Sequence, residues 1–179
     1  NIKKIKKEIL NLLINKTQLK GKKIIVTAGP TSEDLDPIRT ITNKSSGKMG
    51  IFIAEEAAKR GADVTLLRGS TIIEPSENIK DIKITSVNDL FKKIKQSLKK
   101  ADILIHAAAV SDFTIKKQNN KIKSNKQLNL KLKPTIKILD QIKKLNKKIF
   151  LVAFKAEHNL KKSELINKAY TTLKKSNSD

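Results

Sequence analysis

Short apolar runs and longer segments with helical spacing alternate along the chain. We predict strands over residues 23–28, 63–67, 81–85, 102–107 and 148–154, and helices over residues 48–60, 87–99, 134–145 and 160–175. Alternation of strands with helices is typical of a parallel sheet that is covered on both faces. The pattern therefore predicts an α/β fold with a Rossmann-like, doubly wound, mostly parallel sheet.

Local signals refine these elements. Gly61 is expected to end the first of the helices as its C-cap, and Ser86 to begin the second as its N-cap. Residues 102–107 show almost no alternation, so this strand, like residues 148–154, is expected to be buried. Residues 121–133 do alternate between apolar and polar positions, and we predict a β-hairpin flap there.

The start of the chain differs from the rest. Residues 2–13 carry apolar positions at helical spacing among lysines, which predicts a basic amphipathic helix. We interpret residues 1–20 as a linker from a preceding domain, and residues 21–179 as the folded domain. A membrane-surface role for the helix is the weaker alternative, because it is short and has no aromatic anchor. The chain begins with Asn1 and is expected to be a piece of a longer protein.

Composition limits the class of protein. The net charge of +22 suggests a polyanion partner, but the charge is almost all lysine spread along the chain, and aromatic residues make up only 3%. We therefore favour a solvated basic surface over a specific nucleic-acid site, and keep a nucleic-acid-binding protein as an alternative. The absence of cysteine excludes disulfides and fits a cytoplasmic location, and the longest apolar runs are too short to span a bilayer.

The strongest chemical signal follows the strand at residues 23–28. Gly29 opens a polar loop that contains Arg39 and Asn43 and ends in Ser45-Ser46-Gly47-Lys48-Met49-Gly50, where a helix begins. A helix N-terminus offers free N–H groups and a positive dipole end, so this loop predicts a site for a phosphorylated small molecule. The structural alternatives are an N-cap at one of the serines, a surface ion pair of Arg39 with Glu33 or Asp36, and a turn at Asn43.

Two familiar nucleotide motifs are missing from this loop. No G-x-G-x-x-G follows the first strand, and Gly47-Lys48-Met49 lacks the residues of a P-loop. A second loop, at residues 107–113, is made of small residues that let a ligand approach the backbone, and Asp112 in it is expected to bind a ribose hydroxyl or a metal, or simply to cap a helix. His106 and His158 are interpreted as structural or lone residues, so a zinc site is not expected.

Because ligands of parallel sheets bind beyond the carboxyl ends of the strands, the loops after Ala28, Ala107 and Phe154 are expected to meet. The first two contain the motifs just described. In the flap, Lys121 or Lys123 could close over a polyphosphate, although spacing alone cannot single out one lysine in so basic a chain.

Together these segments resemble the phosphopantothenate–cysteine ligase family, in the carboxy-terminal half of the bifunctional prokaryotic coenzyme A biosynthesis protein and in its archaeal style. The resemblance covers residues 21–179 and is carried by six stretches, residues 27–31, 36–39, 42–50, 107–113, 121–123 and 152–157. It implies ligation of phosphopantothenate to L-cysteine through an acyl-cytidylate formed from CTP, with Mg²⁺ on the triphosphate. A non-catalytic Rossmann-type nucleotide-binding module is the alternative.

The resemblance also implies roles by position. Asn43 would hold the acyl-nucleotide and donate to its carbonyl oxygen, Arg39 would support the cysteine step, and Lys121, preferred over Lys123, would neutralise the triphosphate. The implied nucleotide site comprises Gly29, Ala109, Asp112, Lys121 and Phe154, and the implied site for the phosphate or carboxylate of the substrate comprises Ser45, Ser46, Gly47 and Lys48. Asp112 is the one candidate metal ligand.

Further implications concern partners and departures. The family implies a homodimer whose flap crosses the interface, and an upstream decarboxylase half, which alone would bring FMN. Lys155 stands where the family usually has a small residue, and His158 replaces the usual threonine. The chain stops before the strand and loop that complete the family's nucleotide pocket, so the ligase domain is expected to be incomplete at its C-terminus.

Overall fold

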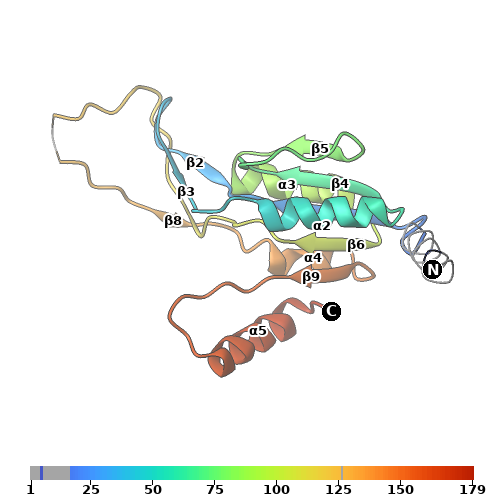
Figure 1. The fold of residues 1–179 in the computed structure, drawn as a ribbon. Coiled ribbons are helices and arrows are strands. Elements are labelled where there is room, and N and C mark those ends of the chain that lie inside the picture. Colours follow the sequence, from blue (N-terminus) through green and yellow to red (C-terminus); the bar gives the residue numbers. More distant parts are fainter. Residues whose placement is uncertain (1–4, 6–16, 126) are drawn as a thin grey trace.

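The fold is built around one parallel sheet (Figure 1), in a computed structural model that describes residues 5, 17–125 and 127–179. Five parallel strands lie in the order β5-β4-β1-β6-β9. Their bounds are β1 Lys23–Ala28, β4 Asp63–Arg68, β5 Lys80–Lys83, β6 Ile103–His106 and β9 Phe150–Ala153. The predicted α/β architecture with a doubly wound parallel sheet is confirmed, and its first strand lies at the centre.

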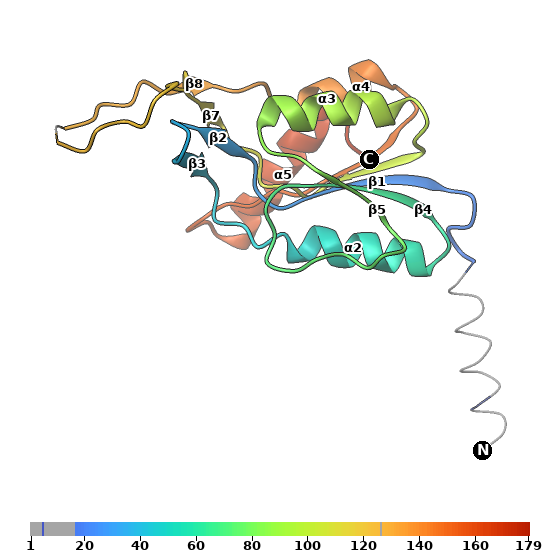
Figure 2. The same cartoon turned by 90° about the horizontal axis from the view of Figure 1, so that it is seen from above.

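Helices cover both faces of the sheet (Figure 2). Helix α2 (Lys48–Lys59) lies on one face, and helices α3 (Val87–Leu98) and α4 (Leu139–Leu145) lie on the other. Two apolar cores result, one around Ile51 and Leu66 beneath α2, and one around Leu90 and Leu104 beneath α3. The C-terminal helix α5 (Lys162–Ser176) packs beside α4 and has only Ser176 buried.

The sequence explains the central elements. Strand β1 has five consecutive buried residues, as expected of a strand with a helix on each face. Helix α2 can approach β1 closely because Gly50 faces it: a Cβ added at Gly50 would lie 2.5 Å from the Cβ of Ala28. Helix α3 begins at the predicted cap, where the Ser86 hydroxyl accepts a hydrogen bond of 3.2 Å from the N–H of Asp89.

The strand at residues 148–154 was predicted to be buried, and this is wrong. β9 is an edge strand in which Phe150 is 51% exposed and only Leu151 is buried. Strand β6, predicted to be buried on both faces, likewise has only Leu104 fully buried. An apolar run reports the tendency of a strand to be covered, and it carries no information on how many neighbours the strand has.

The flap is also different from the prediction. Among the described residues of 121–132 no strand forms, and the pairing lies at the base of the flap, where β7 (Phe113–Thr114) is antiparallel to β8 (Lys133–Pro134). The three leucines of the flap are 41–48% exposed, so the apolar side of the flap is not packed against another element of the fold. Figure 1 shows the flap as a long excursion from the sheet.

Pro134 was predicted to open a helix, and this too is wrong. Hydrogen bonds from the Thr135 N–H to Asp112 O (2.9 Å) and from the Thr135 hydroxyl to Ser111 O (2.6 Å) hold this segment extended, so helix α4 begins only at Leu139. A second antiparallel pair, β2 (Ser32–Asp34) with β3 (Thr40–Thr42), was not predicted. Both small hairpins stand beyond the carboxyl ends of the parallel strands (Figure 1).

The predicted linker helix at residues 2–13 lies outside the described residues, apart from Ile5. In the part of the chain that the structure describes, no helix is both long enough and apolar enough to cross a membrane.

Candidate functional site

The loops after β1 and β6 are joined at the carboxyl end of the sheet. The Ala109 N–H donates to Gly29 O at 2.9 Å, the Thr31 N–H donates to Ala109 O at 3.2 Å, and Pro30 forms a parallel bridge with Ala109. The strand order reverses between β1 and β6, which is where doubly wound sheets bind ligands. The predicted meeting of these two loops is confirmed.

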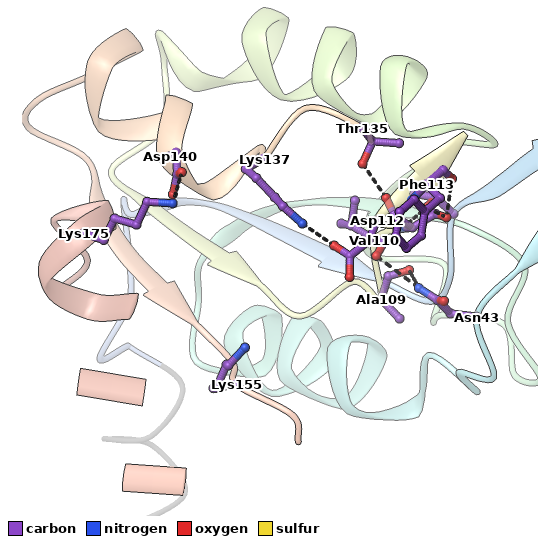
Figure 3. A network of polar contacts seen from close by, with 12 residues as sticks. Asn43, Ala109, Val110, Asp112, Phe113, Thr135, Lys137, Asp140, Lys155 and Lys175 are labelled. Atoms are coloured by element: carbon purple, nitrogen blue, oxygen red, sulfur yellow. Dashed lines mark hydrogen bonds and ion pairs between the residues drawn. The ribbon is translucent and has the colours of Figure 1, made fainter. Parts of the chain in front are cut away.

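Asn43 joins this junction from β3. Its Nδ2 atom donates to Ala109 O and to Val110 O, each at 3.1 Å, and Figure 3 shows it pointing at the loop after β6. The structure therefore brings together Asn43 and Ala109, two residues that the family resemblance placed in the site. In this arrangement the amide donates to backbone carbonyls, so donation to a substrate carbonyl requires it to leave one of them.

The start of helix α2 is a candidate anion site because it lacks a side-chain cap. Gly47 is the N-cap, with φ of 73°, and no side chain caps the helix there. The serine hydroxyls expected as caps make only long contacts, from Ser45 to the Gly47 N–H at 3.4 Å and from Ser46 to the Lys48 N–H at 3.5 Å. We call residues 45–50 the cradle. Its N–H groups and the exposed Lys48 can bind a phosphate or carboxylate.

Two glycines shape the cradle. Gly29 and Gly47 both have φ of +73°, in the left-handed region that glycine adopts without a steric penalty. A Cβ at Gly47 would lie 2.3 Å from Cγ2 of Thr71, and one at Gly29 would lie 2.9 Å from the same atom. The cradle, the loop after β1 and the loop after β4 are thus packed directly against one another.

Arg39 lies between β2 and β3, where it contacts the flap. Its Nη1 donates to Ile122 O at 3.0 Å and pairs with Asp36 at 3.4 Å, so the ion pair considered for it from sequence is present. Asp36 is buried and accepts the N–H groups of Ile122 and Arg39, and these bonds, with that of Ile122 the largest cause, lower the pKa of its carboxyl. Together Arg39 and Asp36 fasten the flap residue that follows Lys121.

A second part of the site is a cavity of about 360 Å³ between the ends of β6 and β9, which we call the β6–β9 cavity. Three lysines line it, and each pairs with a carboxylate: Lys137 with Asp112 at 2.5 Å, Lys175 with Asp140 at 2.8 Å, and Lys155 with Glu157 at 2.9 Å. Figure 3 shows the first two pairs. The pairing with Lys155 is the largest cause of a lowered pKa at Glu157.

The predicted residues Asp112 and Phe154 both line the β6–β9 cavity, which brings the loop after β9 to the loop after β6, whereas the lining of this cavity includes no residue of the loop after β1. Phe154 is 48% exposed, so its ring is available to a ligand. The carboxylate of Asp112 is paired with the ammonium group of Lys137. Among the described residues, no group of three or more His, Cys, Asp or Glu could hold a metal ion. The donor set therefore does not fit a metal held by the protein alone.

The two histidines differ. His106 lies in β6, where its Nδ1 is 2.9 Å from the Thr27 hydroxyl, and burial lowers its pKa to about 4. It also lines the β6–β9 cavity, which the sequence did not indicate. His158 is exposed in the loop after β9.

The structure does not bring Lys121 to the β6–β9 cavity. Lys121 lines a separate cavity of about 900 Å³ within the flap, together with Leu35, Ile122 and several lysines. Sequence reasoning missed Thr71, Lys137 and Lys175. For the two lysines no signal existed, because lysines occur throughout the chain.

Comparison with known proteins agrees with this geometry. Residues 19–179 match the model of the family described as "DFP: DNA/pantothenate metabolism flavoprotein C-terminal domain". The Coenzyme A biosynthesis bifunctional protein CoaBC of Thermococcus kodakarensis is 49% identical over 164 residues, which are 90% of this chain and 40% of the relative. CoaBC of Methanocaldococcus jannaschii is 36% identical over 177 residues, which are 99% of this chain and 44% of the relative. The chain thus spans less than half the length of these relatives.

Solved structures show the same fold. A crystal structure of the C-terminal domain of CoaBC matches with a TM-score of 0.77 and 34% identity, over 89% of this chain and 75% of that one. A complex of Cab2 mutant H337A with phosphopantothenate-cysteine matches with a TM-score of 0.74 and 21% identity, over 97% of this chain and 73% of that one. At this identity the match shows a similar fold and nothing more. The expected resemblance is confirmed: the chain is similar to the C-terminal part of CoaBC, and it belongs to the family of the C-terminal domain of DNA/pantothenate metabolism flavoproteins.

Proposed function

We propose that this chain is the phosphopantothenate–cysteine ligase domain of coenzyme A biosynthesis, and that it uses CTP. Its membership of the family and its similarity to CoaBC proteins support this function. The main structural support is one arrangement: Asn43 stands two residues before the cradle and donates to the carbonyl oxygen of Val110, which lines the β6–β9 cavity. Two reactants held in those places would meet at Asn43.

The reaction needs activation, because a carboxylate does not form an amide with an amine in water. A carboxylate oxygen of phosphopantothenate attacks the α-phosphorus of CTP, the α–β phosphoanhydride bond breaks, and pyrophosphate leaves. The amine of cysteine then attacks the acyl carbon, CMP leaves with the former carboxylate oxygen, and the amine loses a proton. The protein contributes positioning and charge stabilisation to both steps.

The described residues fit these tasks. The cradle offers N–H groups and Lys48 to the phosphate of phosphopantothenate, and the β6–β9 cavity offers Phe154 to a base and Asp112 to a ribose. Lys137, Lys155 and Lys175 would exchange their carboxylate partners for triphosphate oxygens, since charge-assisted bonds to phosphate are among the strongest in proteins. Mg²⁺ would be held largely by those phosphate oxygens.

The flap supplies the remaining part of the proposal. Lys121 is held next to the Arg39–Asp36 pair, away from the β6–β9 cavity of its own chain. We propose that two chains form a dimer in which the flap crosses the interface and brings Lys121 to the triphosphate of the partner. The exposed Leu128, Leu130 and Leu132 would then be covered.

The test is mass analysis of the products formed from CTP, Mg²⁺ and phosphopantothenate, with and without cysteine. We expect phosphopantothenoylcysteine and CMP with cysteine, and the acyl-cytidylate without it. Asn43→Asp should stall the reaction with the fold intact, whereas Asn88→Asp, on the exposed face of helix α3, is the matched control and should turn over normally. Normal turnover of Asn43→Asp would refute the role of Asn43.

The same assay is run on this chain and on a chain extended at its C-terminus, and failure of both to cleave CTP or ATP would refute the ligase proposal. Tight binding of NADPH in the same sample, without nucleotide cleavage, would favour the non-catalytic Rossmann-type module instead.

A further inference from the structure

A buried arginine at the end of β4 is linked to the cradle. Arg68, at the end of β4, is 3% exposed. Its Nε and Nη2 donate to the two oxygens of Asp81 on β5, each at 2.8 Å, and Nη2 also contacts Glu74. Two parallel bonds from one guanidinium fix the orientation of the group as well as its position.

The remaining nitrogen of this guanidinium holds Thr71. Arg68 Nη1 donates to the Thr71 hydroxyl at 2.8 Å, and that hydroxyl in turn donates to Ile73 O at 2.9 Å. Because β-branched side chains have restricted χ1 angles, these two bonds also fix the direction of the methyl group, Cγ2. The side chain is therefore locked through its polar atom, while its apolar atom is free to make packing contacts.

The Thr71 methyl group fills the space left by the two glycines of the site. Positions that a Cβ would take at Gly47 and Gly29 lie 2.3 Å and 2.9 Å from it. The backbone adds two fixed points, from the Ile72 N–H to Ser46 O at 3.2 Å and from the Gly69 N–H to Ala28 O at 3.0 Å. The loop after β4 thus supports the cradle from behind.

We infer that Arg68, oriented by Asp81, is a positioning residue: it holds the Thr71 methyl against Gly29 and Gly47 and so fixes the N–H groups of the cradle for the substrate phosphate. This inference rests on the proposed function for the identity of the anion. A shift of about 1 Å in a binding group can cost up to about a hundredfold in rate, so a support of this kind matters to function beyond its effect on stability.

The competing explanation is that Arg68 only ties β4 to β5. Three variants distinguish a positioning role of Arg68 from a purely structural one. Arg68→Lys keeps the charge and loses the two-pronged geometry, and Thr71→Ser keeps the hydroxyl and loses the methyl. Arg60→Lys is the matched control, because Arg60 also forms an arginine–carboxylate pair, with Glu56, but on the surface of helix α2.

The first readout is the KM for each substrate. We expect Arg68→Lys and Thr71→Ser to raise the KM for phosphopantothenate about tenfold and to leave the KM for CTP unchanged, with Arg60→Lys as wild type. An equal change in both KM values, or no change in either, would overturn the inference.

The second readout needs no ligand and is hydrogen exchange of the backbone amides. We expect exchange at the Ile72 and Ile51 amides, which donate to Ser46 O and Gly47 O of the cradle, to become at least about tenfold faster in Arg68→Lys and in Thr71→Ser, and to stay unchanged in Arg60→Lys. Unchanged exchange at these two amides in Arg68→Lys, even with lower overall stability, would show a purely structural role. If neither this chain nor a chain extended at its C-terminus has ligase activity, the proposed function fails, and this second readout still decides whether Arg68 positions the cradle.

Discussion

Replacing Gly47 with alanine tests the packing of the cradle directly. The new Cβ would lie 2.3 Å from Cγ2 of Thr71 and 3.2 Å from the Cα of Gly29, and φ at this position is +73°. The Thr71 side chain cannot rotate away without losing the hydrogen bonds that its hydroxyl makes. The substitution therefore adds a steric overlap to a backbone penalty.

The two effects can be sized separately. A left-handed backbone costs an alanine about 1–2 kcal/mol, and overpacking costs about 1–3 kcal/mol, so Gly47→Ala should lower the free energy of unfolding by about 2–5 kcal/mol. Gly21 is the matched control, because its φ is +79° and nothing lies within 4 Å of an added Cβ. Gly21→Ala should therefore show the backbone penalty alone.

Urea unfolding of both variants measures this difference. We expect the midpoint for Gly47→Ala to fall clearly below that for Gly21→Ala. Adding Thr71→Ser to Gly47→Ala should recover part of the loss, with a coupling of about 1 kcal/mol, because the contacting methyl is gone. Equal midpoints for the two glycine variants, or strict additivity of the double variant, would refute the packing described here.

Three further predictions concern other parts of the fold. Burial holds the pKa of His106 at about 4, against 6.5 for a free histidine. The neutral ring is favoured in the folded state, so the contribution of His106 to the free energy of unfolding is complete above pH 6.5 and is lost as the pH falls toward 4. In urea unfolding, wild-type stability should therefore fall by about 2 kcal/mol more than that of His106→Gln between pH 7 and pH 5. Ser86→Ala should cost about 1 kcal/mol in the same assay, since it removes the cap of helix α3. Asp36→Asn should speed tryptic cleavage in the flap, because the buried carboxylate that accepts the Ile122 N–H loses its charge.

Much of the parallel sheet could be predicted from the sequence, because short stretches of neighbouring residues indicate its strands and the starts of its helices. Residues 24–26 are three consecutive β-branched apolar residues, and Ser86 stands where a cap is needed, so β1 and the start of helix α3 were predicted correctly. The flap and the segment at Pro134 were not, because their conformations depend on pairing between residues about twenty positions apart. The exposure of β9 depends on its place at the edge of the sheet, which no local pattern encodes.

The same distinction holds for the site. Asn43 could be proposed because it stands in a polar loop after a strand, and Ala109 through the family resemblance carried by the small residues of its loop, and the structure places the two in contact. Asp36 was considered only as a partner for Arg39, and its hydrogen bond to the flap appears only in three dimensions. Lys137 and Lys175 could not be distinguished from the other lysines of a chain with a net charge of +22.

The most direct test of the proposed ligase reaction follows one oxygen atom. Phosphopantothenate labelled with ¹⁸O in its carboxylate is incubated with CTP, Mg²⁺ and cysteine, and the nucleotide product is analysed by mass spectrometry. Activation as an acyl-cytidylate predicts CMP that carries one ¹⁸O, because the carboxylate oxygen that attacks the α-phosphorus leaves with CMP. Label in inorganic phosphate, or amide formation with unlabelled CMP, would contradict the account.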